Sequence, residues 1–471
     1  MERRWDVVVV GGGASGTLLA AQLLRGAREP LRVALLERTG RVGPGLAYST
    51  ESPSHLLNVP AGRMSAFPDD PEHFLRWLRR VEPGTGPGDF AQRRRYGQYL
   101  EDVLHEARRD AAPGVDLELL SGEVVSIAQE GDSVRVALEG GPVLEARTAV
   151  LAVGNALPSD LSVEDGGLYA SPRYIRSPWL EGSLERVGPQ DAVLLVGTGL
   201  TMVDTVLSLV ERGHQGRIHA LSRHGLLPHV HRPAAARTFV ELREPPRIRS
   251  LLRTLRQEAR FAREDDDWRG VVDALRPHTA SLWRGLSEPE RRRFLRHLRS
   301  FWEVHRHRMA PAVGEVLERL QRAGVLSIHA ARVRSFRPVD PGVEVRFRRR
   351  GLVHEDTLLV QHVINCTGPD GTIARAHPLL RGLLASGHVR ADALGLGLAT
   401  DPGGALLDAE GEPSSVLFTL GPLRRGELWE TTAIPEIRMQ ALALARRLLE
   451  QRASSSRSRD TGPFPLPPPF P

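Results

Sequence analysis

Two glycine-rich segments have the composition and spacing that binding of a diphosphate requires. The first is GGGASG at residues 11–16, and the second is GTGLT at residues 197–201. A pyrophosphate needs backbone N–H donors with no Cβ in the way, so Gly11 would make the tight turn, Gly13 would let the phosphates approach and Gly16 would let a helix pack against its strand. The positive end of that helix would face the phosphates. The first segment therefore predicts a dinucleotide site.

The elements around the first segment are those that such a turn needs. Residues 6–10 form a continuous apolar run, as expected of a parallel strand buried on both faces, and residues 17–24 have helical spacing. A second buried strand over residues 32–36 ends at Glu37. Because Glu37 follows Gly16 by about 20 residues, its carboxylate can bind the adenosine ribose hydroxyls. The sequence thus predicts a βαβ unit that holds an adenine dinucleotide.

The same construction recurs in the middle of the chain with two changes. Strands are expected over residues 192–196 and 217–221, on either side of Gly197, Gly199, Thr201 and a helix. Met202 replaces the third glycine, and the second strand ends in Ser222-Arg223 rather than in an acid. Since an acid would repel a 2′-phosphate and Arg223 could bind one, we expect NADPH rather than NADH, the alternative being that Arg223 is only a solvated strand end.

The repeat continues beyond the two strand–turn–helix units. Residues 117–154 hold short alternating segments that close on Gly154, and residues 326–368 repeat the pattern and close on Gly368. We therefore predict an α/β fold with two Rossmann-like dinucleotide-binding domains, for FAD and NADPH, carrying a helical insertion and small antiparallel β insertions. We expect the FAD domain to consist of two parts, residues 1–160 and 366–450. The NADPH domain is expected over residues 161–365, with its helical insertion at about 245–325. Residues 451–471, rich in Pro, Ser and Arg, are expected to form a disordered tail. Two such sites on one chain imply a resident flavin that receives hydride from the second nucleotide.

Composition narrows the chemistry further. The chain has 471 residues, and all 63 of its basic residues are arginines, which excludes lysine Schiff bases and lysine general bases. The single cysteine, Cys366, excludes a disulfide framework and a multi-thiolate metal site within one chain. Basic residues are scattered among acids, no apolar run is long enough for a membrane span, and the start of the chain does not look like a secretory signal. We therefore expect a cytoplasmic protein that binds a small-molecule substrate, with no nucleic-acid or membrane partner; its oligomeric state is left open.

Side chains that could suggest a metal are better explained in other ways. His305 and His307 are two residues apart, so on a helix they point away from each other and cannot share an ion. The acidic triplet at residues 265–267 lies in a charged helical region and is typical of a solvated face. We expect no metal site and assign no catalytic side chain.

Several longer motifs resemble a known family. They are ER at 37–38, GPGLAYS at 43–49, HLLNVP at 55–60, FWEVHRHR at 301–308 and GPLRRGELWETT at 421–432. Together they resemble the bacterial FAD/NAD(P)-binding flavoproteins, over about residues 5–450. The N-terminal domain is similar to that of flavin enzymes that N-hydroxylate amino acids, including those that form nitrosuccinate.

The resemblance implies roles for individual residues. The ADP half of FAD would be held by Gly11, Gly13, Ser15, Gly16, Glu37 and Arg38. His55, Leu57, Asn58 and Val59 would lie beside the isoalloxazine ring, and Gly421 would make a second FAD contact. Residues 431–436 look like the start of a helix whose positive end could stabilise the reduced flavin.

Three functions remain open from the sequence. The first is an FAD-dependent, NADPH-using flavin monooxygenase, similar to N-hydroxylases, that acts on a small amine or amino-acid-like substrate. The second is a flavin-dependent reductase or dehydrogenase with an acceptor other than oxygen. The third is a non-catalytic redox sensor whose nucleotide occupancy controls a partner.

Overall fold

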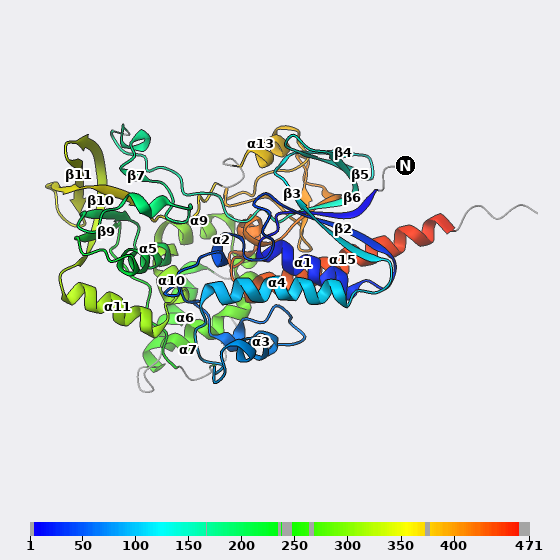
Figure 1. Ribbon diagram of the computed structural model, residues 1–471, viewed down its shortest axis with the longest axis horizontal. Helices are drawn as coiled ribbons and strands as arrows, with labels where there is room; N and C mark the ends of the chain where they lie inside the picture. The colour runs from blue at the N-terminus through cyan, green and yellow to red at the C-terminus, as the bar shows by residue number, and fades with distance from the viewer. Residues whose placement is uncertain are drawn as a thin grey trace, which may run out of the picture.

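The computed structural model describes residues 4–165, 167–233, 237, 247–262, 268–372 and 377–460. Two sheets with separate cores lie side by side in this part of the chain (Figure 1). This arrangement confirms the predicted α/β class with two dinucleotide-binding units. The acidic triplet at residues 265–267 falls outside the described residues.

The first sheet has the strand order β14-β15-β6-β1-β2-β3, with the hairpin β4-β5 attached to β6. Its strands are β1 (Trp5–Val10), β2 (Leu31–Glu37), β3 (Val115–Ser121), β4 (Val124–Glu130), β5 (Ser133–Leu138), β6 (Val143–Leu151), β14 (Ala405–Leu407) and β15 (Pro413–Thr419). The central pairs β15/β6, β6/β1, β1/β2 and β2/β3 are parallel. Strand β15 thus returns from the far end of the chain to complete the N-terminal sheet.

Helices cover both faces of this sheet. The helices of this part of the chain are α1 (Ala14–Gly26), α2 (Gly45–Tyr48), α3 (His73–Val81), α4 (Arg93–Arg109), α13 (Pro378–Ala385), α14 (Arg425–Leu428) and α15 (Ile434–Asp460). Apolar side chains of α1, α4 and α15 fill one core, and α13 packs with the β4-β5 hairpin over the opposite face. Helix α1 is buried along almost its whole length, which is why its sequence is apolar on all sides.

The second sheet has the order β12-β11-β10-β9-β8-β13-β7. Its strands are β7 (Tyr174–Ile175), β8 (Val193–Val196), β9 (Ile218–Ser222), β10 (Leu326–Val339), β11 (Gly342–Arg349), β12 (Asp356–Val360) and β13 (His362–Asn365). Strands β7, β13, β8, β9 and β10 are parallel, and β10, β11 and β12 continue as an antiparallel meander. Helix α5 (Leu200–Glu211) joins β8 to β9, so this sheet repeats the β1-α1-β2 unit.

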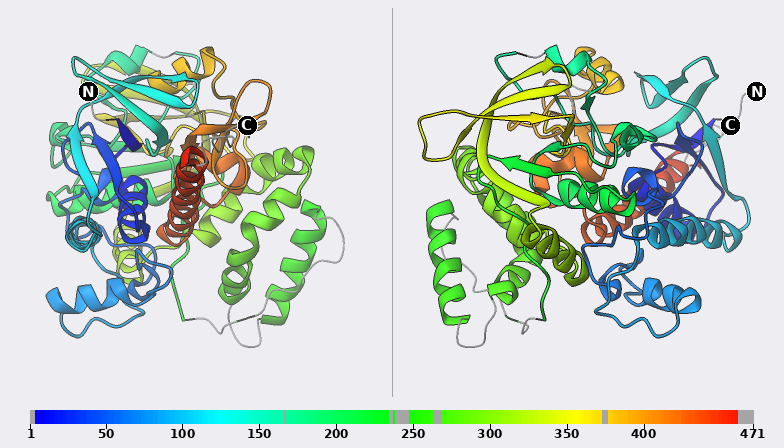
Figure 2. Two further views of the ribbon diagram at one scale, coloured as in Figure 1. Left: turned by 90° about the vertical axis from the view of Figure 1, so that its right-hand side faces the viewer. Right: turned by 60° about the vertical axis from the view of Figure 1, so that its left-hand side comes forward.

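The segment between β9 and β10 is helical. It contains α6 (Ile248–Phe261), α7 (Trp268–Leu275), α8 (Thr279–Gly285), α9 (Glu288–His297), α10 (Arg299–Arg306) and α11 (Pro311–Arg322). Figure 2 shows the green helices of this insertion standing beside the orange and red C-terminal part of the chain. A small core of its own, with Trp283, Leu286 and Trp429, joins the insertion to residues that follow β15.

The end of the chain differs from the expectation. Helix α15 continues to Asp460, ten residues into the segment that the sequence predicted to be disordered. Alanine, glutamine and arginine are good helix formers, and Arg452 ties this end of the helix to Asp6 with an Nε–Oδ1 distance of 3.1 Å. Composition alone therefore placed the boundary of the tail too early, while residues 461–471 lie outside the described part.

Within the described residues, no helix has the combination of length and apolar character needed to cross a lipid bilayer.

Candidate functional site

The two glycine turns have the same backbone geometry at their first glycine. Gly11 has φ 109° and Gly197 has φ 117°, values that L side chains rarely adopt. A Cβ on Gly11 would lie 2.4 Å from the carbonyl oxygen of Ala152, and one on Gly197 would lie 2.3 Å from that of Cys366. Each turn therefore passes directly against the strand that closes its own domain, and only glycine fits.

The third position distinguishes the two turns. A Cβ on Gly16 would lie 1.9 Å from the Gly11 carbonyl oxygen, so helix α1 needs glycine there to pack against its own turn. Met202 occupies the matching position of α5 and is completely buried in the core of the second sheet. The second turn therefore accepts a large side chain by pointing it into the core.

Both helices begin without a side-chain cap. The residues before α1 and α5 are Gly13 and Gly199, and neither helix has a side-chain hydrogen bond to its first N–H groups. Those donors are left for water or a ligand. An uncapped helix start after a glycine turn is the arrangement that binds phosphate groups, so the structure provides two places for a pyrophosphate.

Glu37 closes the first turn from the end of β2. One carboxylate oxygen, Oε2, accepts a hydrogen bond from the Gly12 N–H at 2.9 Å. The other, Oε1, accepts from the N–H and the hydroxyl of Thr39 at 3.0 and 2.9 Å. The carboxylate is thus held beside the glycine turn with lone pairs left over, as binding of a ribose requires. Arg38 follows it and is exposed.

The closing glycines occupy equivalent places. Gly154 follows β6 with φ 74°, and Gly368 follows β13 with φ 82°. Neither has a heavy atom within 4 Å of the position where a Cβ would be. Both turns are therefore open on the side where a side chain would stand.

Gly421 brings the C-terminal part of the chain to the first turn. It has φ 77°, and a Cβ on it would lie 2.7 Å from the hydroxyl of Ser15 in the first turn of α1. Its carbonyl oxygen accepts a hydrogen bond from Thr431 Oγ1 at 2.6 Å. Gly421, Ser15 and the beginning of α15 thus meet at one place.

His55 lies at the contact between the two domains. Thr50 Oγ1 donates to its Nδ1 at 2.8 Å, and its Nε2 donates to the backbone oxygen of Asp204 at 3.0 Å and lies 2.9 Å from Ser208 Oγ. Burial lowers the pKa of His55, so the ring is neutral at pH 7. Because the protein uses both ring nitrogens, His55 joins the first domain to α5 and leaves no nitrogen for a flavin.

The residues that follow His55 are divided between the core and this interface. Leu57 and Val59 are buried in the core of the first sheet. The backbone oxygen of Asn58 accepts a hydrogen bond from His231 Nε2 at 3.0 Å, which ties this loop to the segment that leads into the helical insertion. Their predicted place beside a flavin ring remains a prediction.

A buried ion pair reinforces the same interface. The guanidinium of Arg93, at the start of α4, lies 2.9 and 3.1 Å from the two carboxylate oxygens of Asp204 in α5. Only 13% of the Arg93 side chain and 8% of the Asp204 side chain are exposed. Burial raises the pKa of Asp204, against the opposing effect of Arg93. Sequence reasoning missed this pair, because no local pattern shows that α4 and α5 meet.

Arg223 stands at the end of β9 with two further arginines that no sequence motif marks. The register pairs Ala330 of β10 with Ser222 of β9, so Arg332 follows on the neighbouring strand. The N–H of Arg350 donates to the Ala330 carbonyl oxygen at 2.7 Å, which places Arg350 at the same end of the sheet. All three side chains are exposed.

These arginines converge on His224. Burial, followed by the charges of Arg350, Arg223 and Arg332, lowers the pKa of His224. None of the three makes an ion pair with any residue that the structure describes, whereas Arg334 and Arg346 share Glu355. An unbalanced positive charge therefore gathers beside the second glycine turn. The register of β9 and β10 creates it, which is why the sequence showed only Arg223.

Thr201 and the hydroxyls near it are engaged in the local framework. The Thr201 carbonyl oxygen accepts from Thr205 Oγ1 at 2.7 Å inside α5. The Thr198 hydroxyl lies 2.5 Å from the Leu226 oxygen and 2.8 Å from Ser222 Oγ. These contacts fix the second turn to the end of β9.

The remaining candidate groups do not form a metal or thiol site. Among the residues with described positions, no cluster of three or more His, Cys, Asp or Glu side chains could hold an ion. His305 packs against His229 and Trp268, with ring centroids 4.5 and 4.7 Å apart. Cys366 is buried, and burial raises the pKa of its thiol to about 12, so it stays protonated.

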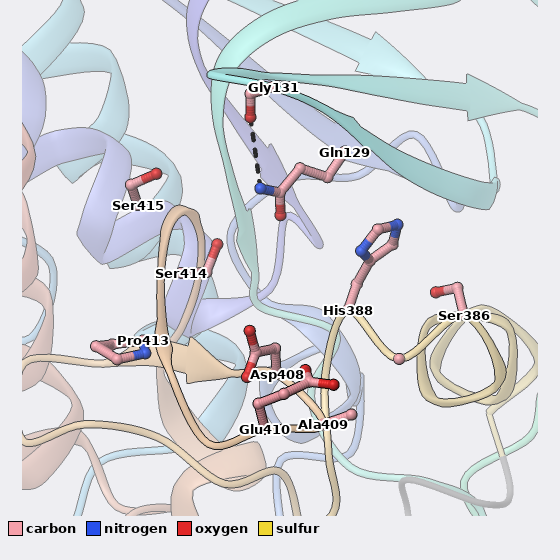
Figure 3. Close-up of a pocket in the computed structure, with 11 residues that line it drawn as sticks. Gln129, Gly131, Ser386, His388, Asp408, Ala409, Glu410, Pro413, Ser414 and Ser415 are labelled. Atoms are coloured by element: carbon pink, nitrogen blue, oxygen red, sulfur yellow. Dashed lines mark hydrogen bonds between the residues drawn. The ribbon is translucent and has the colours of Figure 1, made fainter.

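Two hollows lie away from the glycine turns. One of about 510 Å³ lies between the β4-β5 hairpin and the β14-β15 connection, with Gln129, His388 and Asp408 among its lining (Figure 3). The other, of about 470 Å³, lies at the domain contact beside Thr50 and Ser208. None of the predicted nucleotide-binding residues lines either one.

Comparisons with known proteins agree with this geometry. Residues 8–156 match the FAD-NAD(P)-binding family model, which confirms the predicted class of cofactor for the first turn. The chain is 26% identical over 234 residues to a nitrosuccinic acid synthase of Aspergillus oryzae, a match that covers 45% of this chain. It spans only about a third, 36%, of that enzyme's length.

The likeness to solved structures extends over nearly the whole chain. An ornithine N-hydroxylase of Kutzneria, solved with reduced FAD, NADP⁺ and L-ornithine, superposes with a TM-score of 0.65 at 16% identity and covers 96% of this chain and all of that one. A thioredoxin reductase of Lactococcus lactis gives a TM-score of 0.54 at 12% identity, with coverage of 96% and 100%. At these identities the likeness shows the fold, which hosts both monooxygenases and reductases.

Proposed function

Because residues 8–156 match the FAD-NAD(P)-binding family model, we propose that this chain is an FAD-dependent, NADPH-using oxidoreductase of the flavin monooxygenase type. Its substrate is a small amine or an amino-acid-like molecule. The observation that carries the proposal is the pair of uncapped glycine turns, each followed by a helix, with three arginines beside the second that no described acid pairs. The likeness to an ornithine N-hydroxylase supports the same assignment.

FAD fits the first turn. The N–H groups at the start of α1 would bind its pyrophosphate, Glu37 would accept hydrogen bonds from its ribose hydroxyls, and Ser15 and Gly421 would lie beside it. An FAD bound there would supply the redox chemistry, which is two-electron exchange with a nicotinamide and activation of dioxygen. The protein would position the reactants and keep water away.

NADPH fits the second turn. A 2′-phosphate carries up to two negative charges, and Arg223, Arg332 and Arg350 offer guanidinium groups that no described acid neutralises. An NADH site would have an acid at the end of β9 in their place. The domain contact through His55 and Asp204 holds this turn in a fixed relation to the first domain.

The single cysteine limits the acceptors that the reductase alternative could use. A disulfide reductase passes electrons through a thiol pair, and this chain has a single cysteine, buried and with a raised pKa. Any reductase activity of this chain would therefore need a different acceptor.

The visible spectrum of the purified protein after incubation with FAD is the first test. We expect a yellow protein that oxidises NADPH faster than NADH. With a panel of amines and amino acids, a true substrate should raise oxygen consumption without an equal release of hydrogen peroxide. A protein that takes up no flavin would refute the proposal. Peroxide equal to the NADPH consumed, with every substrate tried, would favour a reductase.

A further inference from the structure

Two sequence motifs, of which only Gly421 belongs to a predicted nucleotide site, meet in space. Residues 301–308 belong largely to α10 in the helical insertion, and residues 421–432 come after β15. Trp302 Nε1 donates to Glu430 Oε1 at 2.7 Å. Arg306 Nε and His307 Nε2 each lie 3.9 Å from the other carboxylate oxygen of Glu430. The buried Glu430 carboxylate therefore joins the insertion to the segment that leads into α15.

The residue before Glu430 has an unusual backbone. Trp429 has φ 61° and ψ −64°, and it is the one non-glycine residue with positive φ in the described part of the chain. The N–H of Glu430 donates to the carbonyl oxygen of Leu428 at 2.8 Å, which closes a γ-turn. For a bulky residue this conformation is strained and persists only when surrounding contacts hold it.

The helical insertion supplies those contacts. The Trp429 ring lies 5.0 Å from the ring of Trp283 in α8 and 5.1 Å from that of Phe294 in α9, measured between centroids. The guanidinium of Arg425 lies 4.8 Å from its centroid. Trp283 Nε1 also donates to the Gly426 carbonyl oxygen at 2.8 Å. Aromatic side chains of α8 and α9, two helices far away in sequence, therefore pack against the turn.

The γ-turn leads directly into contacts with the first glycine turn. Thr431 Oγ1 donates to the Gly421 carbonyl oxygen, and Gln440 donates to Thr431 Oγ1 at 2.9 Å while accepting from the Gly421 N–H at 3.0 Å. Gly421 lies against Ser15 in the first turn of α1. A continuous series of contacts therefore runs from Trp283 in the insertion to the first glycine turn.

We propose that Trp429 is a positioning residue, through which the helical insertion holds residues 421–436 against the first glycine turn and its FAD. The γ-turn at Trp429 is strained, and its contacts with Trp283 hold it in that conformation. The inference rests on the proposed function, because it takes FAD to occupy the first turn.

A comparison of two small substitutions tests the strain. Trp429→Ala removes the anchor and keeps a Cβ at positive φ, whereas Trp429→Gly removes the anchor and the strain. Glycine normally destabilises a folded chain relative to alanine. Here we expect the reverse, with an unfolding equilibrium constant about 5- to 150-fold larger for the alanine variant. An alanine variant as stable as the glycine variant, or more stable, would refute the strain.

The variant Trp283→Phe tests the coupling between the helical insertion and the FAD site, and it keeps an aromatic ring in the core. It removes the hydrogen bond to Gly426, and we expect a Kd for FAD raised about 2- to 12-fold together with a shifted flavin reduction potential. The matched control is Trp77→Phe, which removes the Nε1 hydrogen bond of another buried tryptophan, to Asp102, away from this turn. Equal effects of the two variants on FAD binding, or none from Trp283→Phe, would refute the inference alone. A wild-type protein that binds no FAD would refute the proposed function as well.

Discussion

The buried pair Arg93–Asp204 gives the most demanding test of how the two domains are joined. Arg93→Met keeps most of the length of the side chain and removes the charge that faces Asp204, whose side chain is 8% exposed. Breaking a buried pair by removing one partner costs about 3–5 kcal/mol, because an uncompensated charge stays buried. Asp204, whose pKa burial already raises, can take up a proton in this variant, which limits the loss. The lower end of the range, about 3 kcal/mol at pH 7, is therefore expected.

Thermal unfolding measures this loss. For a unit of about 200 residues, 3 kcal/mol corresponds to a fall in Tm of roughly 6–12 °C. Replacing both residues, with Arg93→Met and Asp204→Leu together, should restore much of the stability, because a well-packed apolar pair replaces a buried ion pair at little cost. A double variant that loses the sum of the two single losses, or an Arg93→Met protein with an unchanged Tm, would refute the reasoning.

The same pair predicts a pH dependence. Burial raises the pKa of Asp204 in the folded protein above its unfolded value of about 3.9. The folded protein then holds this proton more tightly than the unfolded chain does. The contribution of Asp204 to the free energy of unfolding is therefore greatest below about pH 4 and declines as pH rises through the folded pKa. In Asp204→Asn this part of the stability profile should disappear, which urea titrations at a series of pH values would show.

Three further outcomes are expected. The variants Arg223→Ser, Arg332→Ser and Arg350→Ser should each raise the KM for NADPH by roughly fivefold or more and leave the KM for NADH unchanged, because each removes about 1 kcal/mol or more of attraction for the 2′-phosphate. The control is Arg346→Ser, since the Arg346 side chain pairs with Glu355. Equal effects on the KM values of both cofactors would contradict the assignment. The Gly11→Ala variant should lose FAD uptake, measured as visible absorbance, because the added Cβ would lie 2.4 Å from the Ala152 oxygen. In the control variant Gly88→Ala the added Cβ has no atom within 4 Å, so this protein should bind FAD as the wild type does. Cys366 should resist thiol reagents at about pH 8 in the native protein and react after unfolding, since burial raises its pKa to about 12; rapid native labelling would show that the strand end opens.

Local sequence patterns were enough to predict the two glycine turns. A buried strand, a glycine turn and an apolar helix are contiguous in sequence, so their spacing alone identifies Gly11, Gly16 and Gly197, and the structure shows why no other residue fits there. The repeat of this unit was enough to predict two parallel sheets, because each βαβ segment specifies its own pairing. Residues 451–460 were predicted to belong to a disordered tail on their polar composition, whereas α15 continues through them to Asp460 and Arg452 pairs with Asp6.

The positions of the other side chains at the candidate site depend on contacts between residues far apart in the chain. His55 is placed by α5, which begins at Leu200, and Glu430 by α10, from the helical insertion of the second sheet. Arg332 and Arg350 join Arg223 only because β10 pairs with β9 in one register. Sequence spacing specifies the contacts within one strand–turn–helix unit. Which side chains of different units share a charge, a hydrogen bond or a strained turn is decided when the units pack, because those contacts have no counterpart in the order of the residues.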